Sequence, residues 1–179
     1  MDFAGFRAQL AADLVQAVPT GVKVGEHPGR FDLAEVERYS VEAPCVRVAL
    51  LSAADADLAE PYSDVECSAY ILTKTGKAGL ADKQLLTLGV GLSAYLRYFA
   101  VGGDDAQSPQ QIKFTNLYST SVGKDGIALG AVTWRQRIPL AAPPAAGSLA
   151  DFLKFYADWN VGQDAASPEA EDRVDYPSS

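Results

Sequence analysis

The chain has 179 residues, 48% of them apolar and 21% charged, which is the size and composition of one ordinary globular domain with a sizeable core. Its formal net charge is -8, from 15 Lys and Arg against 23 Asp and Glu, which argues against sequence-independent nucleic-acid binding and against anionic lipid surfaces. No apolar stretch approaches the roughly 18 residues that suggest a membrane span, and the first residues lack a signal-peptide pattern.

The first forty residues predict a helix, a short strand and a second helix. Apolar residues recur at three- and four-residue steps over residues 3–18, which predicts an amphipathic helix. Residues 22–24 alternate like a short strand. Asp32, with Glu35 three residues later, has the spacing of a capping box, so we expect a helix of two turns over residues 32–39.

The middle of the chain predicts two strands and the longest helix. Residues 45–51 are mostly apolar on both faces, which is typical of a central strand covered on both sides. Residues 65–73 alternate again, and between these strands we expect an acidic loop over residues 52–64. Leucine and aromatic residues at helical spacing predict a helix over residues 82–100.

A long β-hairpin is predicted next. Residues 111–118 and 127–140 read as strands, and the Asp125-Gly126 pair between them favours a tight turn because glycine supplies a positive φ. A strand that long either bends across a sheet or projects from the domain as an arm. One of its faces is apolar and the other carries arginines. The apolar face holds Ala128, Val132, Trp134 and Ile138, and the opposite face holds Thr133, Arg135 and Arg137.

The C-terminal region has a different composition. Residues 141–147 resemble a linker, residues 148–160 are rich in aromatic side chains, and residues 163–172 are polar and acidic. We therefore predict a single α+β domain over residues 1–147. A C-terminal segment over residues 148–179 would pack on this domain or extend from it.

Residues suited to catalysis or metal binding are scarce. Cys45 and Cys67 lie in apolar strands and outside any CxxC pair, which favours two buried, reduced thiols over a disulfide. The one histidine, His27, lies among turn residues and is expected in an exposed loop. Serine-elbow, phosphate-loop, EF-hand and dinucleotide fingerprints are absent. We expect no metal, no cofactor and no enzymatic activity.

Taken in order, several stretches resemble the Mu-like phage tail proteins of gene 37 type, which are thought to be tail terminators of long-tailed phages. The most characteristic stretch is residues 125–136, where a Gly-Ile-Ala-Leu run leads to Trp134 in the long strand. At Gly130 the family is expected to carry a larger, often aromatic residue. The other stretches that carry the resemblance are residues 6–18, 32–36, 43–49, 151–159 and 169–172.

The resemblance implies an antiparallel sheet with a long β-hairpin and two main helices packed on one face. It also implies a homo-oligomeric ring, expected to be a hexamer, at the head-proximal end of the tail tube. There the ring would stop tube polymerisation and offer a surface for head–tail joining. Its partners would be the tail tube protein, the sheath protein where the tail has one, and the connector proteins of the neck. DNA would pass through the lumen without specific binding, and the protein would reach the virion from the bacterial cytoplasm without contacting a membrane.

Two groups of residues are candidates for contacts in such a ring. We expect the hairpin over residues 118–126 and the two arginines to meet a neighbouring subunit, and the acidic loop to face the lumen or the tube. The candidate interface residues are Tyr118, Lys124, Asp125, Arg135, Arg137 and Trp159, and the candidate lumen residues are Asp55, Asp57 and Glu60. Core packing for the tryptophans and a solvated surface for the charged residues remain alternatives.

Two other functions remain open. One is a different neck, head–tail connector or tube-completion component, which would differ from a terminator in its position on the tail. The other is a small enzyme or ligand-binding domain, which predicts a deep pocket with converging polar groups and a stable monomer.

Overall fold

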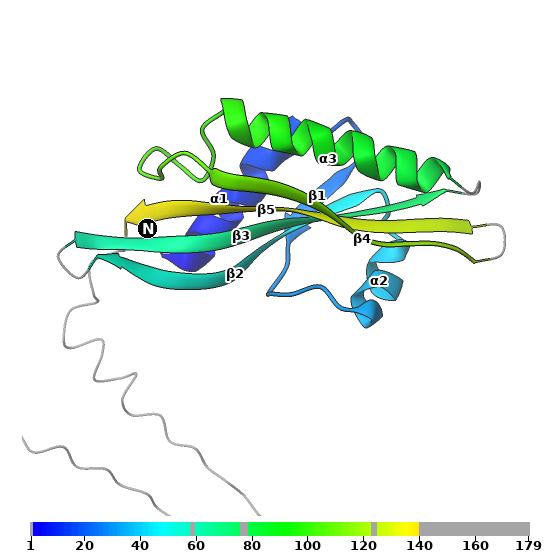
Figure 1. Cartoon of the computed structure of the whole chain (residues 1–179), viewed down its shortest axis with the longest axis horizontal. Helices are drawn as coiled ribbons and strands as arrows, with labels where there is room; N and C mark the ends of the chain where they lie inside the picture. Colours follow the sequence, from blue (N-terminus) through cyan, green and yellow to red (C-terminus); the bar gives the residue numbers. More distant parts are fainter. Residues whose placement is uncertain (1, 58–59, 76–78, 123–124, 140–179) are drawn as a thin grey trace, which may run out of the picture. The chain divides into compact units, whose positions relative to one another are not determined.

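A five-stranded sheet with helices on both faces forms the centre of the fold (Figure 1), so the predicted α+β class is confirmed. The computed structural model describes residues 2–57, 60–75, 79–122 and 125–139. The predicted segment 148–179 lies outside these residues. The elements are α1 (Phe3–Leu14), the short 3-10 helix η1 (Val15–Ala17), β1 (Lys23–Glu26), α2 (Leu33–Ser40), β2 (Cys45–Asp57), β3 (Glu60–Thr75), α3 (Leu80–Tyr98), β4 (Gln110–Val122) and β5 (Asp125–Pro139).

The sheet is mixed, because one edge strand runs parallel to its neighbour. The strand order is β1-β2-β3-β5-β4, in which β1 pairs with β2 in parallel and the other three pairings are antiparallel. The expectation of a purely antiparallel sheet is therefore wrong at this edge. The chain between β1 and β2 includes α2 and returns to the end from which β1 started, and such a crossover makes consecutive strands parallel.

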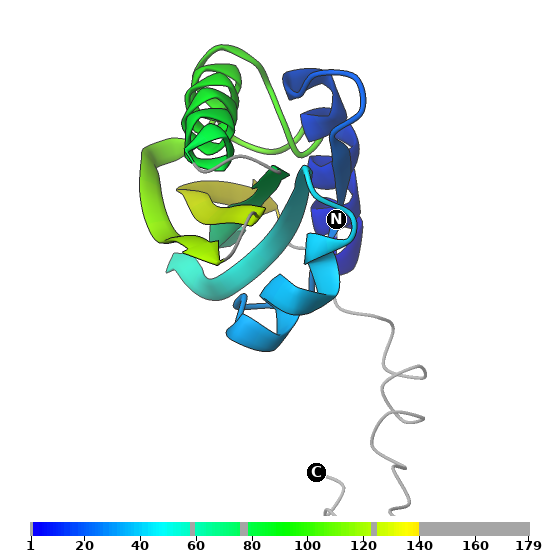
Figure 2. The same cartoon turned by 90° about the vertical axis from the view of Figure 1, so that its right-hand side faces the viewer.

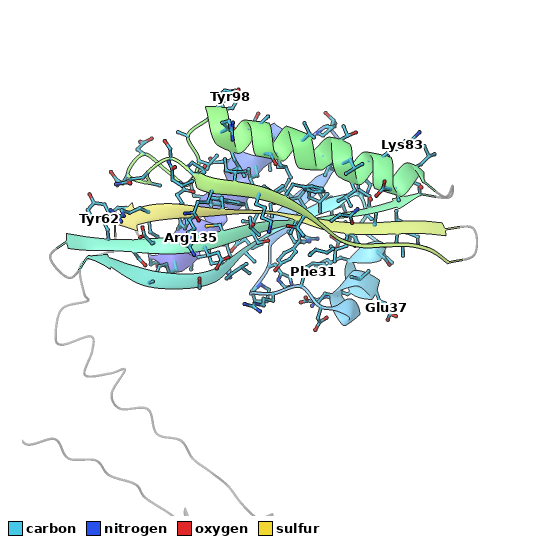
Figure 3. The ribbon with its side chains drawn as sticks, in the orientation of Figure 1. Phe31, Glu37, Tyr62, Lys83, Tyr98 and Arg135 are labelled. Carbon is cyan, nitrogen blue, oxygen red and sulfur yellow. The ribbon has the colours of Figure 1, made fainter. Side chains whose placement is uncertain are left out.

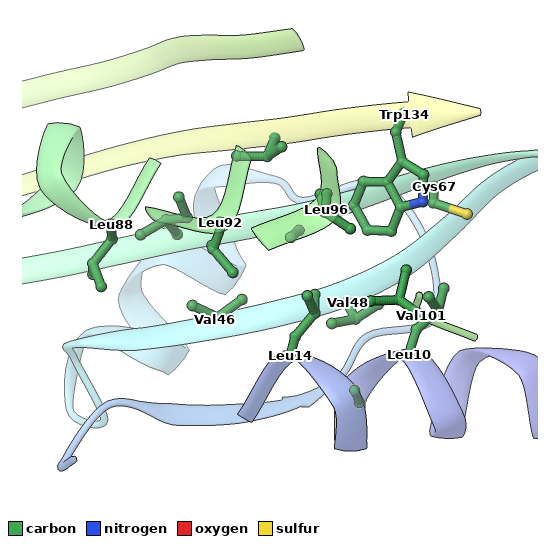
Figure 4. Close-up of a cluster of buried hydrophobic side chains, with 14 of the residues drawn as sticks. Leu10, Leu14, Val46, Val48, Cys67, Leu88, Leu92, Leu96, Val101 and Trp134 are labelled. Atoms are coloured by element: carbon green, nitrogen blue, oxygen red, sulfur yellow. The ribbon is translucent and has the colours of Figure 1, made fainter. Parts of the chain in front are cut away.

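The main core lies between the sheet and two helices, α1 and α3, which cover the same face (Figures 1 and 4). Leu10 and Leu14 of α1 and Leu92 of α3 are fully buried there against Val46 and other strand residues. The prediction of two main helices on one face is therefore confirmed. The helical spacing in the sequence located both helices because their apolar residues form one continuous stripe on each.

A smaller core lies on the opposite face, under α2 (Figure 2). Val36 of α2 packs there with strand residues that include Cys45 and Leu72. Asp32 caps α2 and completes the predicted capping box with Glu35, since each side chain accepts a hydrogen bond from the other's backbone N–H. Because α2 covers only the part of the sheet near the start of β2, the strands are buried on both faces there.

The long strand β5 is an interior strand of the sheet. It pairs with β3 from Gly126 to Pro139 and with β4 on its other side, so it does not project as an arm. Its predicted apolar face is confirmed, since Trp134 and the other three residues of that face are buried. Gln136 lies on the same face and is also buried, where it accepts a hydrogen bond from the Trp134 indole and donates one to the Val101 carbonyl.

The prediction of an acidic loop over residues 52–64 is wrong. β2 continues to Asp57 and β3 begins at Glu60, so Asp55, Asp57 and Glu60 are strand residues at the closed end of a hairpin. The ladder of backbone pairs reaches Asp57 and Glu60, with register shifts on the way. The end of a hairpin is held by backbone hydrogen bonds and does not require apolar side chains. The acidic composition of residues 52–64 therefore did not exclude strands.

Two glycines of α3 provide a matched pair of substitutions. A Cβ on Gly89 would lie 2.5 Å from the Phe114 ring, and that ring is also 3.1 Å from the Cβ position of Gly130, so it has little room to move. The same geometry explains why Gly130 carries no larger residue. A Cβ on Gly91 would meet only the Ala17 carbonyl oxygen, at 3.9 Å.

We therefore expect opposite effects from alanine at these two positions. Gly91→Ala should stabilise the protein by roughly 0.5–1 kcal/mol through helix propensity. Gly89→Ala should destabilise it by about 1–3 kcal/mol because the ring must be displaced. Urea unfolding of both variants measures the difference, and a shift of the same sign in both would contradict the packing of Phe114 on α3.

Candidate functional site

The longer of the two edge strands of the sheet is β4. It has 13 residues, whereas β1 at the opposite edge has four. Within the described residues, only β5 pairs with β4, so the outer edge of β4 presents a row of backbone N–H and C=O groups that no strand covers. Such an edge can accept a strand or an extended segment from another chain.

Exposed aliphatic side chains lie on the helix and the strand at this edge. On α3, Asp82, Leu86 and Val90 are four residues apart and follow one side of the helix. The first of them accepts a hydrogen bond from the Asn116 side chain of β4 at 3.3 Å, so α3 begins beside the edge strand. Leu86 is 44% exposed, Val90 is 71% exposed, and Leu117 of β4 is 49% exposed. We call Leu86, Val90 and Leu117 the α3/β4 patch.

Basic side chains flank the α3/β4 patch. Lys83 precedes Leu86 by three residues and Arg97 follows Val90 by seven, so both lie on the same side of α3, and both are exposed (Figure 3 labels Lys83). With Asp82, α3 has one acidic and two basic residues, although the whole chain has a net charge of -8. Apolar surface bordered by charge is typical of protein–protein contacts.

The two predicted interface arginines lie elsewhere, on the sheet face opposite α1 and α3. Arg137 donates hydrogen bonds to both carboxylate oxygens of Asp64, at 2.9 and 3.3 Å, and this pairing holds the pKa of Asp64 below its usual value. Arg135 is exposed, and in the register it lies opposite Glu66 (Figure 3). Each arginine therefore has a carboxylate of its own chain nearby, and their contact with a neighbour stays a prediction.

The other predicted interface residues are not brought together with the arginines. Tyr118 is in β4, and Asp125 begins β5 at the closed end of the hairpin. Asp125 and Arg135 are ten residues apart on one strand, or roughly 33 Å. Lys124 and Trp159 lie outside the described residues.

The α3/β4 patch was missed from the sequence, although a signal for it exists. Leu86 and Val90 lie off the stripe that predicted the buried side of the helix, so they are aliphatic residues on a side expected to be polar. A search for apolar residues outside the core stripe would have found both. The position of α3 beside β4 could be learned only from the folded structure.

His27 is buried, so the expectation of an exposed loop histidine is wrong. It is 2% exposed. Its Nε2 contacts the Glu35 carboxylate, its Nδ1 lies 2.9 Å from the Gly29 carbonyl oxygen, and the rings of Phe31, Tyr39 and Tyr70 surround it. The turn composition around it was interpreted correctly, but one of the rings that enclose it, Tyr70, lies far along the chain, on β3. The imidazole joins the segment before α2 to the N-terminus of that helix.

The two cysteines are free and fully buried, which confirms the prediction of buried thiols. Burial raises the pKa of both thiols above the usual value, and for Cys45 the nearby Arg47 only partly opposes it. A nucleophilic cysteine requires the opposite shift, because the thiolate is the reactive form.

We expect neither thiol to react with a maleimide reagent in the folded protein, and both to react completely in denaturant. Mass spectrometry after a short exposure measures this difference. Rapid labelling of Cys45 or Cys67 without denaturant would show that the strand interior opens on that timescale.

A groove of about 500 Å³ lies between α3 and the segment that joins η1 to β1. Its walls are mainly apolar and include Pro19, Val22, Pro44 and Leu88, and Lys83 also lines it. Its volume falls in the range of small-molecule sites. Among the described residues, no three His, Cys, Asp or Glu side chains gather closely enough to hold a metal ion. None of the described helices combines the length and the apolar content needed to cross a membrane.

Comparison with known proteins gives no family assignment. No protein-family model matches the chain, and no curated protein sequence is similar to it.

Proposed function

We propose that this chain is a structural subunit of a phage tail, a terminator that assembles with copies of itself into a ring, expected to be a hexamer, at the head-proximal end of the tail tube. The observation that carries the proposal is the long outer edge of β4, which no described strand covers, together with the exposed aliphatic residues on α3 and β4. A chain that leaves backbone groups and aliphatic side chains exposed together has a surface suited to another protein.

The charge of the chain fits this role. A ring that lets DNA pass must not hold it, and a net charge of -8 repels a phosphate backbone. The ordered resemblance to the gene 37 type family supplies the position on the tail, the tube and neck partners, and the location in the virion. A connector or tube-completion component of the neck would use the same kind of surface at a different position.

A second candidate, a ligand-binding domain, is favoured by one observation, the apolar groove beside α3. It predicts that the purified chain remains a monomer and that a small apolar molecule raises its melting temperature.

The oligomeric state with and without tail tubes tests the proposed function. Native mass spectrometry and light scattering should give a closed oligomer of the 19.0 kDa chain, either free or after addition of purified tubes. Electron microscopy of those tubes should show the added density at one end only. A chain that stays monomeric and leaves tube ends unchanged would overturn the proposal. Density along the whole tube would do the same.

A further inference from the structure

We propose that the groove of about 500 Å³ beside α3 is a binding site for a small amphiphilic anion, that is, a carboxylate carried on an apolar chain or ring. We call it the α3 groove. The inference goes beyond the proposed function, because the site would exist in each chain whether or not copies assemble into a ring.

One wall of the α3 groove is a single side of the helix. The α3 residues that line it follow one another at steps of three and four, and they are Leu80, Lys83, Gln84, Thr87 and Leu88. Leu88 is buried, whereas Lys83 and Gln84 are exposed. This wall therefore offers an apolar surface next to an ammonium and an amide group that a ligand can reach.

The opposite wall is apolar and is held in place by backbone hydrogen bonds. It includes Pro19 and Val22 of the segment that joins η1 to β1, together with Pro44. The Val22 N–H donates to the Pro19 carbonyl at 3.1 Å, and the Lys23 N–H donates to the Pro44 carbonyl at 3.3 Å. A wall fixed in this way is formed before a ligand arrives, so binding costs less ordering of the protein.

The charge of the α3 groove selects an anion. Among the described residues that line it, Lys83 is the only charged one, and it forms no ion pair with another described residue. The acidic residues nearest in sequence to the lining positions have other partners, since Asp82 accepts a hydrogen bond from Asn116 and Glu42 contacts Arg47. A ligand with an apolar body and one negative charge matches both walls.

Two ligands with the same apolar chain test this selection in the full-length protein. Octanoate and octan-1-ol differ in charge, and a net charge of -8 disfavours the anion at an average position on the surface. We expect octanoate nevertheless to bind more tightly than octan-1-ol, by a factor of about two to five, which is what one exposed ion pair supplies. Ligand-observed NMR titration measures both dissociation constants, whatever the oligomeric state.

Two substitutions locate the binding. Lys83→Gln should remove the preference for octanoate and leave octan-1-ol binding unchanged, whereas Arg38→Gln makes the same charge change on α2 and should keep the preference. Thr87→Trp places an indole in the α3 groove and should weaken both ligands by more than about tenfold. Its control is Ala94→Trp, at an exposed position of α3 outside the groove, which should bind both like the parent. Circular dichroism verifies that each variant is folded.

Three results would overturn the proposal. They are equal or tighter binding of octan-1-ol by the parent chain, a preference for octanoate that survives in Lys83→Gln, and binding by Thr87→Trp that equals binding by Ala94→Trp. The oligomeric state with and without tail tubes tests the ring separately, so each of the two proposals can fail without the other.

Discussion

Replacing Trp134 with alanine is expected to lower the free energy of unfolding by about 3–5 kcal/mol, the largest loss from any single substitution considered for this chain. Trp134 is among the largest fully buried side chains, and it packs in the main core between the sheet and the two helices. Its indole N–H also donates to Gln136 at 3.0 Å, so its removal leaves that buried amide oxygen without its partner.

Urea unfolding followed by circular dichroism measures this loss. Arg135→Ala is the control, because Arg135 is the next residue on β5 and its side chain is exposed on the other face. The control should change stability by less than about 0.5 kcal/mol. A loss below about 1 kcal/mol for Trp134→Ala would contradict its place in the core.

Replacing His27 with alanine is expected to cost about 2–4 kcal/mol, because it removes a buried ring and leaves the Glu35 carboxylate without its imidazole partner. Glu35 also accepts a hydrogen bond from the Asp32 backbone N–H at the start of α2. The loss of local stability should therefore be greatest in and around α2. Hydrogen exchange measured by mass spectrometry should show that the substitution speeds up exchange, relative to the parent chain, more in α2 than in α1.

The control for this substitution is Arg38→Ala, at an exposed position of the same helix. It should leave exchange in α2 unchanged within a few-fold. If His27→Ala left both stability and exchange at the values of the parent chain, the imidazole would have no part in holding α2 on the sheet.

Local signals predicted most of the secondary structure. The periodic stripes of α1 and α3 and the alternation in β5 are properties of neighbouring residues, so they can be read from sequence alone. The end of the β2–β3 hairpin could not be read in this way, because Asp57 and Glu60 belong to strands through backbone pairing and their side chains give no signal. Burial of His27 depends on Tyr70, which is 43 residues further along the chain.

The candidate site was only partly predictable for the same reason. The sequence drew attention to charged residues such as Arg135, but it could not show which carboxylates of the same chain lie beside them. It also could not show that α3, which carries the exposed Leu86 and Val90, lies beside an edge strand. A surface formed by two elements separated in sequence appears only when both are placed.

The order of the strands in the sheet also affects the folding rate. The β2–β3 and β4–β5 hairpins join neighbours in sequence, whereas β3 and β5 pair only after the chain has formed or bypassed α3 and β4 between them. Closing that long loop costs conformational entropy before any pairing compensates for it, so this step should set the refolding rate. In a cell that makes many copies at once, chains that have not completed this step would expose the unpaired edges of β3 and β5, where strands of other copies could pair.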